Sequence, residues 1–281
     1  MRVAVTGAAG FIGRHVVAQL EERGIAPTLV CRPGSTTPDA WRSDAVVRMD
    51  IAAAPADAYD RLGSPEVLLH LAWGGLPNYS SAHHVETELP AHRSFLEKLL
   101  AAGLGALTVT GTCLEYGMQS GALREDAPTA PVTAYGAAKD ALRTHLEGLQ
   151  RRMPFNLTWA RLFYLHGEGQ ASGSLLPQLE AAIARGDATF DMSGGEQLRD
   201  YLPVEEAVAY LVELGLNGRD NGVVNICSGR PVSVRELVER VVARHGSSLR
   251  PNLGHYPYPD YEPMAFWGDR HKLDNCLGLD R

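Results

Sequence analysis

Tyr135 and Lys139 stand four positions apart in the segment Tyr-Gly-Ala-Ala-Lys. In a helix, side chains at i and i+4 lie on one face, so this phenol and this ammonium can converge on one point. A phenol with a pKa of about 10 is a poor acid–base group at neutral pH, and a neighbouring cation favours its ionised form. We therefore expect Lys139 to lower the pKa of Tyr135. Taken alone, such a pair is more often a solvated helix face, so its meaning depends on the rest of the chain.

A short β-branched run, Arg-Val-Ala-Val at residues 2–5, predicts a buried strand, which leads into Thr-Gly-Ala-Ala-Gly-Phe-Ile-Gly at 6–13 and then a helical pattern. Gly7 permits the tight turn, Gly10 lets the backbone approach a pyrophosphate, and Gly13 allows the helix to pack closely on the strand. The free N–H groups at the start of the helix face the phosphates. Because this glycine pattern lies between a strand and a helix, it predicts a dinucleotide-binding site.

The glycine spacing and the Tyr/Lys pair resemble the extended short-chain dehydrogenase/reductase family, which includes NDP-sugar epimerases, dehydratases and ketoreductases. The resemblance covers essentially the whole chain. His-Leu-Ala-Trp at 70–73 resembles the end of the family's fourth strand, and Thr-Gly-Thr-Cys-Leu-Glu-Tyr-Gly at 110–117 resembles the end of its fifth. Residues 161–167 resemble an Arg-x-x-Asn-x-Tyr-Gly stretch, with Tyr164 and His166 in place of the Asn and the Tyr, and Arg-Asp-Tyr at 199–201 resembles a further motif.

The resemblance implies an NAD(P)-dependent oxidoreductase with three catalytic side chains, Thr112, Tyr135 and Lys139. Hydride passes between the nicotinamide and a sugar carbon while Tyr135 gives or takes the oxygen-bound proton. Thr112 is expected to position the reacting oxygen, and Lys139 to hold the nicotinamide ribose as well. The implied cofactor contacts are Gly7, Gly10, Phe11, Ile12, Gly13, Arg32, Asp50, Ile51, Leu71, Ala72, Trp73, Tyr135 and Lys139.

The end of the second predicted strand distinguishes the two nicotinamide cofactors, because NAD enzymes usually carry an acidic residue there and NADP enzymes a cation. This strand ends in Val-Cys-Arg, with Arg32 last and no carboxylate before Asp39. Arg32 can pair with a 2′-phosphate, helped by Arg14 of the first helix; the alternative is that Arg32 is a solvated loop residue. The sequence thus favours NADP(H), with NAD(H) possible.

Two acid–base residues are absent directly after the predicted catalytic hydroxyl, and this limits the reactions that the chain can catalyse. Family 4,6-dehydratases carry an Asp-Glu pair there, whereas this chain has Cys113 and Leu114. Glu115 follows, and on a continuing strand it points to the opposite face. The prediction is an NADPH-dependent reductase of a nucleotide-activated 4-keto-6-deoxyhexose, in deoxysugar or surface-polysaccharide biosynthesis; the alternative is an NDP-sugar epimerase with tightly bound NAD(P). A redox-inactive NADP-binding regulator is disfavoured, because both Tyr135 and Lys139 are present.

The resemblance places the nucleotide sugar against Trp73, Thr112, Cys113, Tyr164 and Arg199. Arg199 is expected to clamp the diphosphate, since a guanidinium matches phosphate oxygens in bidentate fashion. Trp73 begins a segment, 73–79, that either forms part of the sugar pocket or packs beneath its own loop.

Composition excludes several other classes. The chain has 281 residues, of which 45% are hydrophobic and 21% charged, as is ordinary for a globular enzyme. Its net charge of −7, with no basic run longer than Arg151-Arg152, argues against a nucleic-acid partner. The four cysteines have no metal-ligand spacing, so we expect no metal, and free thiols fit a cytoplasmic protein. No apolar stretch reaches the length of a membrane span, and the early first strand leaves no room for a signal peptide.

Strand-like and helix-like segments alternate through the first two thirds of the chain, which predicts an α/β fold: a Rossmann-type doubly wound parallel sheet. Ligands of such sheets bind beyond the carboxyl ends of the strands. Thr6, Ala72, Thr112 and Tyr164 all follow predicted strand ends, so we expect them to line one cleft.

The regular alternation of strand-like and helix-like segments ends after residue 166, which predicts a smaller C-terminal substrate-binding lobe. We assign 1–166 plus 201–246 to the dinucleotide-binding domain and 167–200 plus 247–281 to the lobe. The family resemblance also implies a homodimer, formed through the helices around 84–102 and 133–152.

Overall fold

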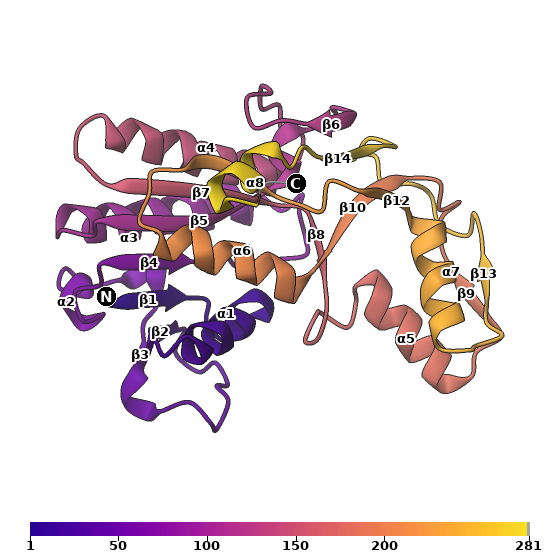
Figure 1. The fold of residues 1–281 in the computed structure, drawn as a ribbon, viewed down its shortest axis with the longest axis horizontal. Coiled ribbons are helices and arrows are strands. Elements are labelled where there is room, and N and C mark those ends of the chain that lie inside the picture. Colours follow the sequence, from indigo (N-terminus) through magenta and orange to yellow (C-terminus); the bar gives the residue numbers. More distant parts are fainter. Residues whose placement is uncertain (280–281) are drawn as a thin grey trace.

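A parallel sheet of seven strands forms the centre of the molecule (Figure 1). The structure is a computed structural model and describes residues 1–279. The strands are β1 (Val3–Thr6), β2 (Thr28–Cys31), β3 (Val46–Arg48), β4 (Val67–His70), β5 (Ala106–Thr112), β7 (Asn156–Leu162) and β11 (Gly222–Ile226). Their order is β11-β7-β5-β4-β1-β2-β3, and all neighbours are parallel. The predicted doubly wound fold is confirmed, with its topological switch point between β1 and β4.

Helices cover both faces of this sheet (Figure 1). One face carries α1 (Phe11–Glu22) and α6 (Val204–Leu216), and the other carries α2 (Ala58–Arg61), α3 (Leu89–Ala101) and α4 (Ala134–Gln150). Val16 of α1 and Val208 of α6 pack in one apolar cluster, while Phe95 of α3 and Leu146 of α4 pack in another. Since the sheet is covered on both sides, all four residues of β1 and of β4 are buried.

Short helices follow or precede several of the strands. They are the 3₁₀ helices η1 (Ser43–Ala45), η2 (Ile51–Ala53) and η4 (Cys113–Tyr116), and the π-helix η3 (His84–Glu88). The sequence predicted a single helix over 84–102, whereas the structure has one π turn that continues directly into α3. A π turn widens the helix by one residue and often marks a functional site.

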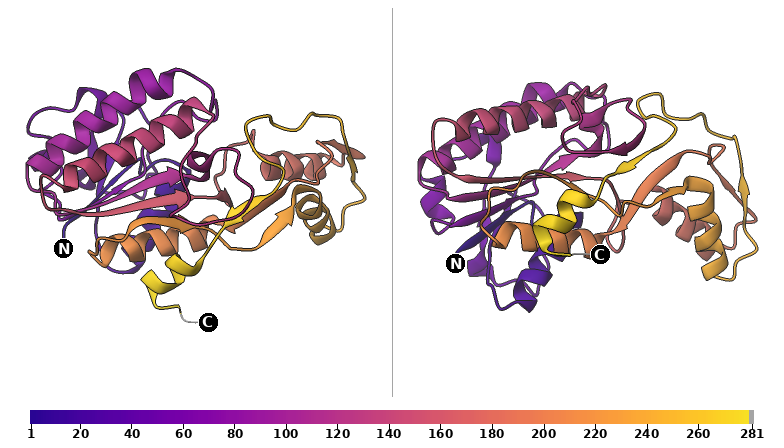
Figure 2. Two further views of the ribbon diagram at one scale, coloured as in Figure 1. Left: turned by 90° about the horizontal axis from the view of Figure 1, so that it is seen from above. Right: turned by 45° about the horizontal axis from the view of Figure 1, so that its top comes forward.

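A smaller lobe lies beyond the carboxyl ends of the sheet strands (Figure 2). Its helices α5 (Leu175–Arg185) and α7 (Val234–Arg244) belong to one apolar cluster, in which Leu179 and Val238 are fully buried. β9 (Thr189–Asp191) pairs with β13 (Arg250–Asn252) at its far side. A three-stranded sheet connects the lobe to the larger part, in the order β12 (Pro231–Ser233), β10 (Leu198–Pro203) and β8 (Tyr164–His166).

Two segments pack with a different part of the molecule from the one to which the sequence assigned them. α7 was assigned to the dinucleotide-binding domain but lies in the lobe, because its apolar stripe around Val238 is buried against α5. Conversely, the tail from 266 onward belongs to the larger part. There β14 (Phe266–Gly268) pairs with β6 (Gly121–Leu123), and α8 (His271–Leu277) packs on α6 and β11 through the fully buried Leu273.

Three observations concern the membrane, metal and dimer predictions made from the sequence. No helix within residues 1–279 combines the length and the apolar character needed to cross a membrane. In the same part of the chain, no three His, Cys, Asp or Glu side chains gather as a metal site requires. The helices of the predicted dimer expose Val85 in η3, whereas α3 and α4 themselves expose no large apolar side chain. Arg143 of α4 pairs within its own helix with Asp140 and Glu147.

Candidate active site

The glycine-rich turn between β1 and α1 depends on close backbone contacts. Gly7 has a φ of +68°, and a Cβ there would lie 2.8 Å from the amide nitrogen of Ala72. A Cβ on Gly13 would lie 2.1 Å from the carbonyl oxygen of Gly7. Both positions therefore require glycine, the first for its backbone conformation and the second for the packing of the helix. The turn opens onto a cavity of about 600 Å³, which we term the cofactor cavity.

Most of the predicted cofactor contacts line this cavity. It runs from the glycine turn past the ends of β2 and β3 to the wall that η3 and α3 form. The predicted residues in its lining are Gly7, Gly10, Arg32, Asp50, Ile51, Leu71 and Trp73. Phe11 and Ile12 instead pack against the apolar clusters around α1 and α6. A glycine turn at a helix start, opening on an elongated cavity, fits a dinucleotide.

Arg32 at the end of β2 is exposed and lines the cofactor cavity beside Ser35 and Thr36. A cation with two hydroxyl groups can bind a 2′-phosphate. Asp50 accepts a hydrogen bond from its own turn, from the amide of Ala52 at 3.0 Å. Arg14, which was expected to help Arg32, is not part of this lining, and its guanidinium lies beside Gly169, where a Cβ would come within 2.7 Å of Nη1.

The three predicted catalytic residues come together where β5 meets the start of α4. Thr133 caps α4 by accepting the amide hydrogen of Gly136 at 3.0 Å, which places Tyr135 in the first turn. The Thr112 hydroxyl lies near enough to the Tyr135 phenol to influence its pKa. All three side chains are buried, and Lys139 is only 1% exposed.

The ammonium of Lys139 is held by β5 and by an aromatic ring. Its Nζ donates to the carbonyl oxygen of Thr110 at 2.8 Å and lies 4.0 Å from the centroid of the Trp73 ring. The Tyr135 ring is more distant, at 5.9 Å. Burial lowers the pKa of Lys139 to about 7, and Glu115 and Glu88 oppose that shift.

The expectation that Lys139 lowers the pKa of Tyr135 is wrong for this structure. Burial raises the pKa of Tyr135, and the nearby Tyr79, Glu115 and Cys113 raise it further, because each disfavours a second negative charge. The nearby Thr112 hydroxyl lowers the pKa of Tyr135, but this opposes the rise only in part. At neutral pH the phenol is therefore protonated, so it is ready to donate a proton rather than to remove one.

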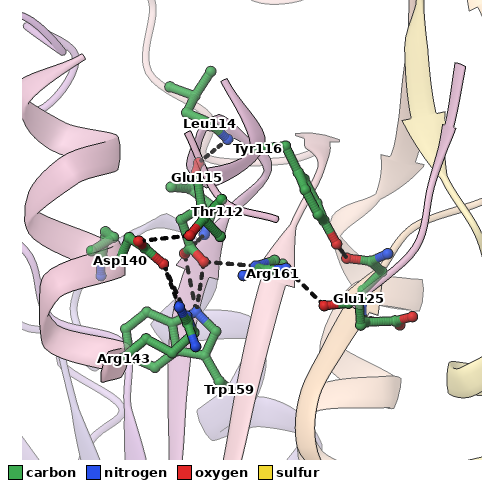
Figure 3. A network of polar contacts seen from close by, with 12 residues as sticks. Thr112, Leu114, Glu115, Tyr116, Glu125, Asp140, Arg143, Trp159 and Arg161 are labelled. Carbon is green, nitrogen blue, oxygen red and sulfur yellow. Dashed lines mark hydrogen bonds and ion pairs between the residues drawn. The ribbon is translucent and has the colours of Figure 1, made fainter. Parts of the chain in front are cut away.

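Glu115 fixes the strand end that carries Thr112 (Figure 3). Its carboxylate accepts hydrogen bonds from the Thr112 amide at 2.8 Å, from Trp159 Nε1 at 3.0 Å and from Arg161 Nε at 2.7 Å. Thr112 Oγ1 accepts from the Leu114 amide at 3.3 Å, so its own proton stays available for another acceptor. The strand does not continue through Glu115 as expected. It ends at Thr112, and η4 turns the carboxylate into the interior, where it is fully buried.

A second cavity, of about 340 Å³, lies between β8, β10 and the lobe, and we term it the substrate cavity. Tyr164 and Arg199 line it together with Glu262 from the tail. Arg199 Nη2 donates to Glu262 at 2.9 Å and Nη1 to the Leu198 carbonyl at 2.8 Å, while the Tyr164 hydroxyl donates to Glu262 as well. The sequence expected a free guanidinium fork for a diphosphate, but this one already holds a carboxylate.

The four residues expected in one cleft are divided among different places. Tyr164 lines the substrate cavity, while Thr6 lies beneath the cofactor cavity as part of the buried core. Ala72 and Thr112 belong to the lining of neither cavity. The same is true of Tyr135 and Lys139, although the Lys139 ammonium lies 4.0 Å from the ring centroid of Trp73, which lines the cofactor cavity. Cys113 is buried beside Thr112, and burial raises the pKa of its thiol.

The sequence did not identify three further polar residues of the site, His92, Glu88 and Glu262. Glu88 and His92 line the cofactor cavity, and Glu262 is the partner of Arg199. The first two were visible as a pattern, since His84, Glu88 and His92 recur every four residues and so share one helix face. Glu262 had no such signal, because it lies 63 residues from Arg199.

A doubly wound sheet with a glycine-lined dinucleotide cavity and a buried Thr, Tyr and Lys defines a nicotinamide-dependent oxidoreductase. Comparison with known proteins agrees. Residues 3–227 match the family model "NAD dependent epimerase/dehydratase family", and the chain belongs to this family. Its relatives are NAD(P)-dependent enzymes that act on nucleotide sugars.

Three relatives illustrate the range of this family. The dTDP-6-deoxy-L-talose 4-dehydrogenase (NAD(+)) of Aggregatibacter actinomycetemcomitans is 30% identical, over 95% of this chain and 99% of that protein. A UDP-glucose 4-epimerase of Azospirillum brasilense is 28% identical, over 88% of this chain and 78% of that protein. Among solved structures, MoeE5 in complex with UDP-glucuronic acid and NAD has a TM-score of 0.84 at 28% identity, over 99% of this chain and 93% of that one.

Proposed function

We propose that this protein is an NADPH-dependent reductase of a nucleotide-activated 4-keto-6-deoxyhexose. The observation that carries the proposal is a protonated Tyr135 beside Thr112, with no second acid–base group directly after Thr112. Cys113 and Leu114 occupy those positions, and the carboxylate of Glu115 is held by Trp159 and Arg161. This set can give one proton to one oxygen, as a ketone reduction requires.

The reductase proposal is compatible with a relative that is named for the opposite direction. A 6-deoxytalose 4-dehydrogenase oxidises the hydroxyl at C4, and the reverse of that step is the reduction of a 4-ketone. A dTDP-4-dehydro-6-deoxyglucose reductase of Escherichia coli is also similar, at 24% identity over 85% of this chain. The direction depends on which cofactor form and which sugar the cell supplies.

NADP(H) is the cofactor we propose, with NAD(H) as a weaker ligand. Arg32, Ser35 and Thr36 offer a cation and two hydroxyl groups at the end of β2, where NAD enzymes usually have a carboxylate. When bound, this cofactor supplies the hydride, and the protein supplies the proton through Tyr135. The relatives include one named for NAD(+) and one named for NAD(P)(+), so the family itself allows either.

We further propose that the nucleotide diphosphate enters the substrate cavity and that Arg199 exchanges part of its contact with Glu262 for phosphate oxygens. The lobe then binds the nucleotide, and Tyr164 and Trp73 lie nearest the sugar. A homodimer through α3 and α4, and a cytoplasmic location, stay predictions from the sequence.

The test is a panel of dTDP-, GDP- and UDP-linked 4-keto-6-deoxyhexoses, with the absorbance of NADPH followed at 340 nm. We expect NADPH and one of these sugars to be consumed one for one. Interconversion of two NDP-hexoses without added cofactor would instead identify an epimerase. Tyr135→Phe serves as the matched control, because it keeps the ring and removes the proton donor.

A further inference from the structure

Beneath the cofactor cavity, polar side chains from four elements form one chain of hydrogen bonds. Thr6 Oγ1 at the end of β1 lies 2.8 Å from His70 Nδ1 at the end of β4. His70 Nε2 lies 2.7 Å from His92 Nδ1 in α3, and His92 Nε2 lies 3.1 Å from Glu88 Oε2. Thr6 and His70 are fully buried, and His92 is 2% exposed.

Only one arrangement of protons satisfies this chain with both rings neutral. The Glu88 carboxylate only accepts, so His92 Nε2 must donate to it. His92 Nδ1 is then an acceptor and takes the proton of His70 Nε2. His70 Nδ1 in turn accepts from the Thr6 hydroxyl. Each ring therefore carries its hydrogen on Nε2, and the neighbouring hydrogen bond fixes the tautomer.

Both ends of the chain hold the segment that follows β4. The amide of Ala72 donates to Thr6 Oγ1 at 3.3 Å, and the amide of Gly74 donates to Glu88 Oε2 at 2.7 Å. Trp73 lies between them with its ring stacked on His92, at 4.6 Å between centroids and 14° between planes. The chain of hydrogen bonds thereby fixes three consecutive residues, Ala72 to Gly74. Gly74 is followed by another glycine, so the backbone of this segment has little stiffness of its own.

The residues fixed in this way form one wall of the cofactor cavity. Trp73, Gly74, Glu88 and His92 all line it. The ammonium of Lys139 lies over the same indole, at 4.0 Å from the ring centroid. The position of the indole therefore sets both the shape of the cavity wall and the access of Lys139 to whatever the cavity holds.

We propose that His92 is a positioning residue for the nicotinamide dinucleotide. It acts by bridging His70 to Glu88, so that the Ala72–Gly74 backbone and the Trp73 ring hold the shape of the bound state before the cofactor arrives. The proposal rests on the cofactor part of the proposed function, and not on the sugar or the direction of the reaction. Preorganisation of this kind strengthens binding because less freedom is lost on association.

The test compares two substitutions of His92. Glutamine offers one acceptor and one donor, so His92→Gln can still accept from His70 and donate to Glu88, whereas His92→Leu can do neither. The Kd values of NADPH and NADH are measured at pH 8 by the quenching of tryptophan fluorescence, alongside the Tm of each variant. We expect His92→Leu to raise both Kd values about tenfold, because two hydrogen bonds with a modest net contribution are lost. The Kd values of His92→Gln should stay within threefold of those of the wild type.

Three further variants make the readout specific. Trp73→Phe identifies the part of the fluorescence change that comes from this ring, the one tryptophan in the cavity lining. His145→Leu is the matched control, because His145 of α4 is half-buried and bonded to Arg93 outside the cavity, and it should leave both Kd values unchanged. Glu88→Leu removes the acceptor of the Gly74 amide and should raise both Kd values as His92→Leu does. This second variant keeps the proposal testable if His92→Leu does not fold.

Two results would overturn the positioning role. One is a lower Tm for His92→Leu and Glu88→Leu with wild-type Kd values, which would make the chain purely structural. The other is an equal loss of affinity in His92→Gln and His92→Leu, which would assign the effect to the ring and not to its hydrogen bonds. If the wild type binds neither cofactor, the cofactor assignment itself fails, and the proposal fails with it.

Discussion

The cofactor cavity and the substrate cavity are built from different parts of the chain. They also differ in the sequence separation between the residues that interact in each of them. The cofactor cavity uses the turns that directly follow β1 to β4 together with η3 and the start of α3, and each part of its wall is a short segment of consecutive or nearly consecutive residues. The substrate cavity combines β8, β10 and α5 with the tail around Glu262. A turn fixes the first by its own geometry, whereas the second forms only when the lobe and the tail have packed.

The largest expected effect concerns the tail. Glu262→Ala removes the carboxylate partner of Arg199, whose side chain is 4% exposed, and leaves a buried cation without its counter-charge. The free energy of unfolding should fall by about 3–5 kcal/mol, measured by urea denaturation. The Kd of NADPH in the folded variant should change less than threefold. A large increase in that Kd would show that the two cavities are not independent.

Tyr135→Phe tests the predicted catalytic residues. The ring is kept and only the proton donor is lost, so kcat should fall by about 10² or more while the Kd of NADPH is unchanged. Steady-state kinetics together with fluorescence titration measures both quantities. A variant that kept most of its turnover would remove Tyr135 from the mechanism.

Arg32→Asp tests the cofactor side alone. The substitution removes the partner of a 2′-phosphate and adds repulsion, so the Kd of NADPH should rise by roughly 10- to 1000-fold. The Kd of NADH should change far less. Equal losses for both cofactors, or tighter binding of NADH by the wild type, would contradict the preference for NADP(H).

The dependence of stability on pH tests the buried histidines beneath the cofactor cavity. Burial lowers the pKa of His70 and of His92 below 6.5, so the unfolded chain takes up protons that the folded one refuses. The stability they contribute is fully present above pH 6.5 and is lost as the pH falls below it. Each histidine adds a slope of up to about 1.4 kcal/mol per pH unit.

Comparison of the wild type with His92→Gln between pH 5 and 6.5 separates this effect from other groups whose pKa is shifted, such as Glu115, because those groups are present in both proteins. Hydrogen bonding from His92 holds the pKa of Glu88 at about 2, and burial holds that of Lys139 at about 7, so neither group titrates strongly in the window. Urea denaturation at several pH values should show a shallower slope for His92→Gln than for the wild type. An unchanged slope would mean that His92 does not stay neutral when the chain folds.

Local spacing explains what the sequence could predict. The glycine turn and the i, i+4 relation of Tyr135 to Lys139 depend only on neighbouring residues, and the structure has the turn and the helix that they require. The pKa of Tyr135 was predicted with the wrong sign, because the spacing to Lys139 is local while the burial that dominates comes from distant segments. The pairing of Glu262 with Arg199 is equally non-local, so neither pattern nor spacing could reveal it.

The fate of the hydride tests the central claim most directly. With NADPH deuterated at nicotinamide C4 and a 4-keto-6-deoxyhexose linked to a nucleotide, the label should appear on sugar C4, stay there, and match the NADP⁺ formed one for one. Mass spectrometry locates the label, and the absorbance at 340 nm counts the cofactor. Interconversion of two nucleotide sugars with no label in either and no net loss of NADPH would contradict the reductase and assign the protein to the epimerases of its family.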